Sequence, residues 1–246
     1  MKNLRSFLLT LTLLVSISSA FAQSVFELRI YHCEPGRRPA LLQRFENHTL
    51  ALFEKHGMKN IGYWNATADS NALYYVLEYP SMESRKTSWK AFGEDPAWHA
   101  ARTASEVSGK IVNRVESIFL KLDTRLSSSI KKPKGASKDR EYELRIYYAK
   151  PGKMPELLDR FANHTRALFD RHHLQNVMYF TTLEEPTVLY YWLAHPKGEV
   201  AAKDNWKSFV QDPDWKKVAS ESEKNGPLIE KIVSVYMKST SFSKLK

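Results

Sequence analysis

The chain has 246 residues, 43% of them hydrophobic, and a formal net charge of +10 at pH 7. This length and apolar content exclude a disordered chain and suit one or two small domains. The single cysteine, Cys33, excludes an intrachain disulfide, so the fold must rest on its hydrophobic core.

The first residues have the pattern of an exported protein. Lys2 and Arg5 give a positive start, residues 7–19 are apolar with Ser and Thr interspersed, and Ala20-Phe21-Ala22 is a small-x-small cleavage site. We therefore expect residues 1–22 to be a signal peptide and the mature protein to be periplasmic or secreted. No later apolar run is long enough to cross a bilayer, so we expect no integral membrane segment after cleavage.

A strand and a helix are predicted next. Apolar and polar residues alternate over residues 25–32, which is typical of a half-buried strand, and Pro35-Gly36 marks a turn. Pro39 suits the first turn of a helix, and Gly57 suits its end. The apolar stripe of this helix comprises Leu41, Leu42, Phe45, His48, Leu52 and Phe53.

Two strands, a helical region and a closing strand follow. Residues 60–65 and 73–79 are the strands, and residues 115–122 close the module. The helical region between them is in two pieces, the second of which begins at Asp95-Pro96, where Asp can cap the helix and Pro fits its first position. The order β-α-β-β-α-β is that of a ferredoxin-like module.

The same pattern then occurs a second time, shifted by about 116 positions. Self-similarity of this length indicates two related modules in tandem, at residues 25–122 and 141–239. Residues 123–140 have no counterpart and are rich in Ser, Lys, Pro and Gly, so we expect a flexible basic linker. The clearest echoes are Phe26-Glu27-Leu28-Arg29-Ile30-Tyr31 with Tyr142-Glu143-Leu144-Arg145-Ile146-Tyr147, and Asn47-His48-Thr49 with Asn163-His164-Thr165.

Two such modules can solve a shared packing problem. Each has helices on one face of its sheet and leaves the other face bare, and the bare faces can cover each other. We therefore predict an α+β fold in which two ferredoxin-like modules pack sheet to sheet as an intrachain barrel, with a homodimer of the chain also open. The positive charge gathers around Lys131-Lys132-Pro133-Lys134 and the C-terminal tail. We attribute it to solubility or attraction to an anionic surface and expect no nucleic-acid partner.

Several motifs resemble the NIPSNAP family. They are His48-Thr49-Leu50-Ala51-Leu52-Phe53-Glu54-Lys55-His56-Gly57, Gly62-Tyr63-Trp64, Trp89-Lys90-Ala91-Phe92 and Asp95-Pro96-Ala97-Trp98, with matching motifs in the second copy. The second copy departs at His173, where Gly57 stands in the first. The resemblance implies a dimeric α+β barrel, a superfamily that also holds small monooxygenases and haem-degrading enzymes. The family itself has no agreed reaction, and fold analogy supplies none.

The first strand of each module carries a repeated polar face. Side chains alternate along a strand, so Phe26, Leu28 and Ile30 share one face. We expect this apolar face to meet the helices, so that the other face points into the space between the sheets. Such a face is either a self-satisfying ion pair or a site for an anionic or carbonyl group, held through the arginine. The residues concerned are Glu27, Arg29 and Tyr31, and in the second copy Glu143, Arg145 and Tyr147.

Two repeated histidines, His48 and His164, fall on the apolar stripe of the first helix. Each is either a core residue with one satisfied nitrogen or a general base beneath the helix. Haem ligation by such a histidine is an analogy with related barrels. HExxH and CxxC motifs do not occur in the sequence, so we expect no metal site, and we assign no cofactor.

These observations lead to three hypotheses. The first is an exported protein that binds a small, partly apolar molecule in an inter-sheet pocket, with the Glu-Arg-Tyr faces fixing a polar group. The second is an oxygenase or isomerase without cofactor, in which His48 or His164 is the base. The third is an interaction scaffold without pocket chemistry, which a barrel filled by side chains would favour.

Overall fold

The structure, a computed structural model, describes residues 24–135 and 138–246, so the predicted signal peptide lies outside the described residues. The first half comprises β1 (Val25–Cys33), α1 (Arg38–Arg44), a π-helical turn η1 (Phe45–Thr49), α2 (Leu50–Lys55), β2 (Lys59–Ala66), β3 (Ala72–Tyr79), α3 (Met82–Glu94), α4 (Pro96–Ser105) and β4 (Val112–Leu122). The second comprises β5 (Glu141–Ala149), α5 (Met154–Arg160), η2 (Phe161–Thr165), α6 (Arg166–Arg171), β6 (Gln175–Thr182), β7 (Val188–His195), α7 (Gly198–Gln211), α8 (Pro213–Ser222) and β8 (Ile229–Ser239).

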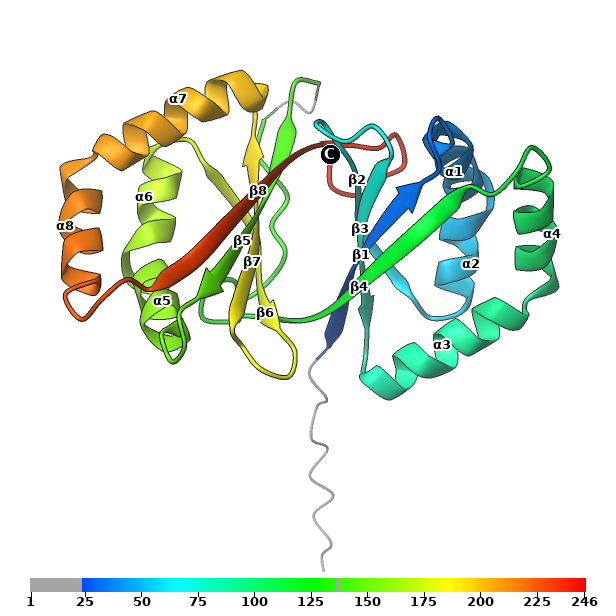
Figure 1. The fold of residues 1–246 in the computed structure, drawn as a ribbon, viewed down its shortest axis with the longest axis horizontal. Helices are drawn as coiled ribbons and strands as arrows, with labels where there is room; N and C mark the ends of the chain where they lie inside the picture. Colours follow the sequence, from blue (N-terminus) through cyan, green and yellow to red (C-terminus); the bar gives the residue numbers. More distant parts are fainter. Residues whose placement is uncertain (1–23, 136–137) are drawn as a thin grey trace, which may run out of the picture.

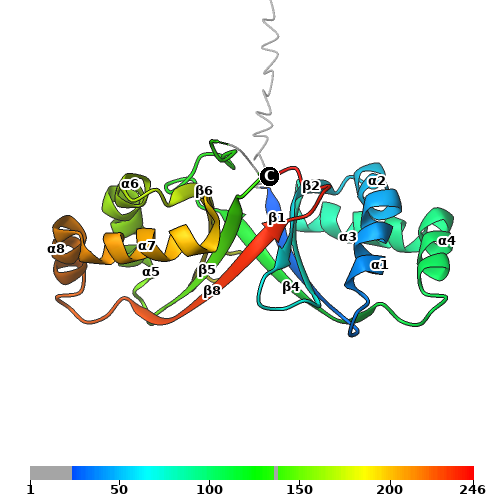
Figure 2. The same ribbon diagram turned by 90° about the horizontal axis from the view of Figure 1, so that it is seen from above.

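The strands form one closed antiparallel barrel in the order β1-β3-β2-β8-β5-β7-β6-β4. The long strands β4 and β8 join the halves, because each pairs with the first strand of its own half and with a strand of the other half. Figures 1 and 2 show the two sheets facing each other in the middle, with the helices on the outer flanks. The prediction of two modules packed sheet to sheet is thus confirmed.

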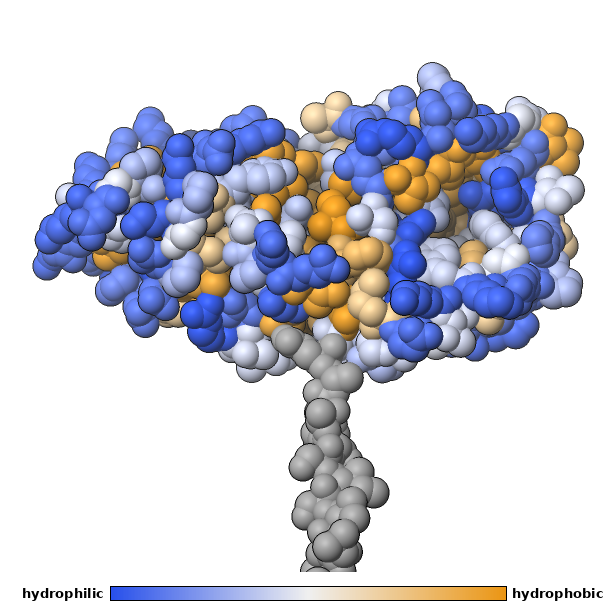
Figure 3. Space-filling view, turned by 60° about the horizontal axis from the view of Figure 1, so that its bottom comes forward, coloured by the Kyte–Doolittle hydropathy of each residue, from blue (hydrophilic) through white to orange (hydrophobic). Residues whose placement is uncertain are grey.

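The hydrophobic core comprises three apolar clusters, of which the one in the barrel interior joins the two halves. The barrel interior is filled by side chains from both halves, among them Leu28, Trp64, Leu144 and Trp192. Each half has a further cluster between its helices and its sheet. On the face seen in Figure 3, apolar residues run through the middle of the molecule and continue over the right-hand part, while hydrophilic ones dominate the left-hand end.

The polar face of the first strand points the opposite way from our prediction. Phe26, Leu28 and Ile30 lie in the barrel interior, whereas Tyr31 packs in the cluster under the helices, and Arg29 contacts Trp89 of α3 there. The reason is that the charged side chains need hydrogen-bonding partners. The closed space between two sheets excludes water from all sides, so it takes the apolar face, while the helices supply hydrogen-bonding side chains for the charged one.

His48 and His164 are exposed rather than on the core-facing stripe. The cause is the π-helical turn that precedes each second helix segment. The backbone N–H of Leu50 bonds to the carbonyl of Phe45, five residues earlier, and Arg166 bonds in the same way to Phe161. Such a turn inserts one extra residue into the helical repeat. The inward position therefore passes from His48 to Thr49, which is 2% exposed.

Two segments outside the modules form backbone hydrogen bonds with the strands β6 and β2. In the stretch 123–140, expected to be a flexible linker, the backbone of Lys131 bonds to Val177 of β6. The C-terminal tail covers β2 in the same manner, through Thr240 and Tyr63, and places Leu245 against the barrel core. Among the described residues, no helix has the length and apolar character to cross a membrane.

Candidate functional site

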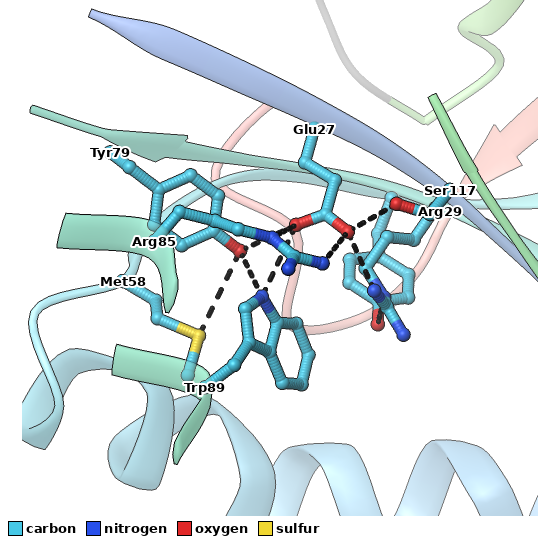
Figure 4. Close-up of polar contacts among 8 residues, drawn as sticks. Glu27, Arg29, Met58, Tyr79, Arg85, Trp89 and Ser117 are labelled. Atoms are coloured by element: carbon cyan, nitrogen blue, oxygen red, sulfur yellow. Dashed lines mark hydrogen bonds and ion pairs between the residues drawn. The ribbon is translucent and has the colours of Figure 1, made fainter. Parts of the chain in front are cut away.

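In the first half, the buried carboxylate of Glu27 collects hydrogen bonds from four elements. Arg29 Nη1 donates to it at 2.6 Å and Ser117 Oγ at 2.5 Å. From α3, Arg85 donates through Nη2 and Nε at 3.0 and 3.1 Å, and Trp89 through Nε1 at 3.2 Å. The Tyr79 hydroxyl completes the cluster at 2.9 Å. In Figure 4, Tyr79, Arg85 and Trp89 converge on Glu27 from one side, and Arg29 and Ser117 lie on the other.

These contacts keep Glu27 ionised although it is fully buried. Burial alone would raise the pKa of this carboxyl, but the hydrogen bond from Arg85 and the charge of Arg29 outweigh that effect and lower the pKa to about 2. The guanidinium of Arg29 also lies 4.3 Å from the ring centre of Trp89. The arrangement is an ion cluster without a free acceptor, which is what a structural role requires.

The second half repeats the cluster around Glu143 with fewer charges. Arg145 Nη1 donates to the carboxylate at 2.9 Å, Ser234 Oγ at 2.6 Å and Trp206 Nε1 at 2.8 Å. His195 Nε2 lies 3.0 Å from Glu143 Oε2. Burial would raise the pKa of Glu143, but the hydrogen bond with His195 and the charge of Arg145 lower it to about 2.

Two replacements distinguish the halves. His195 ends β7 opposite Glu141, where Tyr79 ends β3 opposite Val25. Ala202 lies four residues before the cluster tryptophan of α7, where Arg85 has the same place in α3. The second half has therefore exchanged a phenol for an imidazole and lost one guanidinium.

The second half also contains buried polar atoms without partners. His195 is 1% exposed, and its Nδ1 has no hydrogen-bond partner within the described residues. The Nε of Arg145 and the hydroxyl of Tyr191 are likewise unsatisfied. In the first half the corresponding atoms, Arg29 Nε and the Tyr75 hydroxyl, bond to each other at 2.9 Å. Buried polar atoms nearly always have partners, so His195 Nδ1 is a candidate contact for a further molecule.

A pocket of about 790 Å³ adjoins this cluster and has His195 in its wall. It lies between the 131–134 segment, the ends of β6 and β7, and α7. The charged residues of its lining are mostly basic, and its apolar residues are Pro133, Pro196 and Ala201. The lining residues are Lys131, Lys132, Pro133, Lys134, Asp170, His173, Gln175, Asn176, His195, Pro196, Lys197, Ala201, Asp204 and Asn205.

The predicted site residues separate into two groups. The structure brings together the Glu-Arg pairs, and Arg145 Nη2 also donates to the Tyr147 hydroxyl at 3.2 Å, while the ring centre of Tyr31 lies 5.5 Å from the Arg29 guanidinium. The exposed His48 and His164 belong to neither cluster; His164 borders a shallow hollow between η2 and α8. No group of His, Cys, Asp or Glu suited to a metal ion occurs in residues 24–135 and 138–246.

Sequence reasoning missed the partners from α3, α7 and the strand ends. Trp89 and Trp206 repeat between the copies, so their recurrence was a usable signal. His195 carried no such signal, because it stands where the first copy has Tyr79. Only the fold shows that it approaches Glu143.

Comparisons with known proteins agree with this architecture. The NIPSNAP family model matches residues 26–124 and 142–244. No curated protein matches the sequence. Two solved structures provisionally named as monooxygenases are similar in fold, each at 10% identity. The one from Lactobacillus acidophilus has a TM-score of 0.58 and covers 88% of this chain and 94% of its own. The one from Fusobacterium nucleatum has a TM-score of 0.59 and covers 92% and 94%. An anthrone oxidase-like protein has 11% identity, a TM-score of 0.55, and covers 91% and 94%.

Proposed function

The chain belongs to the NIPSNAP family, and we propose that it binds a small anionic molecule in the pocket of its second half. The observation that carries the proposal is the set of four exposed lysines in the pocket lining: Lys131, Lys132, Lys134 and Lys197. None of them forms an ion pair within the described residues, whereas the neighbouring Lys203 and Lys238 pair with Glu199 and Glu141.

Uncompensated lysines around a concavity attract anions. Four ammonium groups and two carboxylates, Asp170 and Asp204, line the same hollow, so its lining carries a net positive charge. Pro133, Pro196 and Ala201 add an apolar part. This combination supports a ligand that is anionic at one end and partly apolar elsewhere. It moves the binding site we predicted from the inter-sheet space, which side chains fill, to the layer between helices and sheet.

Isothermal titration calorimetry with citrate at low salt tests the proposal. We expect binding that weakens as salt rises, and at least a tenfold loss of affinity in Lys134→Gln/Lys197→Gln. The matched control is Lys203→Gln/Lys238→Gln, which removes two lysines that are already paired. Equal losses in both double variants, or absence of citrate binding to the unmodified chain, would contradict the proposal.

A second candidate function is oxygenase- or isomerase-type catalysis at the same place. The pairing of Glu143 with His195 favours it, because a carboxylate that orients an imidazole is a common arrangement for a general base. The base would then be His195 rather than His48 or His164. Measuring oxygen uptake with anthrone as a probe tests the oxygenase hypothesis. Uptake that is lost in His195→Gln and kept in His48→Gln would support this hypothesis. Absence of uptake by the unmodified chain would contradict it.

Export is a further part of the proposal. It is supported by the three-part signal pattern in residues 1–22. Expression of the full chain in a bacterium should yield a product in the periplasm or medium that begins at Gln23, as N-terminal sequencing would show. A cytoplasmic product that retains Met1 would refute it.

A further inference from the structure

We infer that the ligand of this pocket carries a hydroxyl group beside its anionic group, as hydroxycarboxylic acids do, and that His195 Nδ1 accepts the hydrogen bond from that hydroxyl. The inference rests on the proposed function, because it concerns the same pocket. It adds a specificity-determining residue and a substrate class.

The partner of His195 fixes its tautomer. An ionised carboxylate can only accept hydrogen bonds, so the ring nitrogen facing Glu143 Oε2, Nε2, must carry the proton. In a neutral imidazole the other nitrogen, Nδ1, has a free lone pair and is an acceptor.

That acceptor nitrogen is buried and has no hydrogen-bond partner. His195 is 1% exposed, and no described donor reaches Nδ1. Leaving a buried acceptor unsatisfied is unfavourable, and a pocket ligand that displaces the side chains covering Nδ1 can remove that cost with an O–H group. The lysines of the same lining supply the anion contacts. The hydroxyl and the charge of the ligand would therefore be recognised by different parts of one pocket.

The first half offers no equivalent acceptor. Tyr79 occupies the position of His195, but its hydroxyl donates to Glu27 and accepts from Trp89 Nε1 at 2.9 Å. Arg85 fills the place of Ala202 and completes the cluster. The Tyr-for-His exchange thus provides a variant that the fold already accommodates in its other half.

Two pairs of probes differ by a single hydroxyl: malate against succinate, and citrate against tricarballylate. Calorimetry on the intact chain should show the hydroxylated member of each pair binding about tenfold more tightly, which is the contribution of one hydrogen bond, with malate tested as both enantiomers. In His195→Tyr this preference should fall to about one, and in His48→Gln it should persist.

Each outcome is decisive. Equal affinities within both pairs for the unmodified chain overturn the inference while leaving anion binding intact, and this comparison needs no variant to fold. A preference that survives in His195→Tyr also overturns it, because Nδ1 is then not the acceptor. If none of the four acids binds, the proposed function itself fails.

Discussion

The two halves of the molecule build the same buried carboxylate cluster and finish it differently. Glu27 faces two guanidinium groups and a phenol, and the hydrogen-bonding capacity of that phenol is used. Glu143 faces one guanidinium and an imidazole, with a pocket beside them. In a duplicated chain, one copy of the cluster can keep its stabilising role while the residues of the other copy change, because side chains of both halves stabilise the shared barrel. On our proposal, the first cluster has a structural role and the second takes part in ligand recognition.

Removing the central carboxylate should have the largest effect. Glu27→Ala strands two guanidinium groups, on Arg29 and Arg85, whose side chains are only 12% and 22% exposed, so we expect a loss of about 3–5 kcal/mol in the free energy of unfolding. Glu143→Ala strands one guanidinium and should cost less. Urea denaturation followed by circular dichroism measures both, with the more exposed Glu116→Ala as control. A loss in Glu27→Ala no greater than in the control would disprove the structural role.

Acid should weaken the same clusters. The folded-state pKa of Glu27 is about 2, below the ordinary value of 4.5, so the unfolded chain takes up the proton first as pH falls. The stabilisation is complete above about pH 4.5 and is lost progressively toward pH 2. Such a shift corresponds to about 3 kcal/mol. The difference in unfolding free energy between the unmodified chain and Glu27→Gln should therefore shrink over this range, and a difference independent of pH would refute the assignment.

The helix register gives a smaller, local effect. Thr49 is buried and its hydroxyl donates to the carbonyl of Arg44 at 3.2 Å, and Thr165 does the same to Arg160. Thr49→Ala should cost about 1–2 kcal/mol in unfolding free energy, whereas His48→Ala, at an exposed position, should change it by less than about 0.5 kcal/mol. Thermal unfolding compares the two variants. A larger loss in His48→Ala than in Thr49→Ala would show that His48 faces the core, as in the regular helix that the sequence pattern predicts.

These cases show where sequence reasoning succeeds and where it ends. The repeat, the order of helices and strands along the chain and the cap at Asp95 follow from local patterns. Asp95 caps its helix as expected, and Asp212 does the same at the equivalent position of the second copy. The face of β1 could not be assigned, because alternation separates two faces without saying which one meets the helices. The π-helical turn was not predicted from the sequence, because it changes the helical period by one residue. The role of His195 depends on contacts between residues 52 positions apart.

The two halves also differ in backbone strain at one equivalent position, Gly57 in the first half and His173 in the second. Gly57 has a φ of +75°, and His173 adopts the same left-handed region at +59°, where a side chain is unfavourable. His173→Gly should therefore raise the free energy of unfolding by about 0.5–1 kcal/mol, and Gly57→His should lower it by a similar amount.

The strain is informative because His173 lines the pocket in which we propose that an anion binds, and Gly57 has no such place in the first half's cluster. Strained residues persist where function requires their side chains. His173→Gly should thus gain stability and lose citrate affinity together, as thermal unfolding and calorimetry on the same sample would show. A variant that gains stability without losing affinity would make His173 a neutral departure from the first half and would leave the lysines and His195 as the recognition groups.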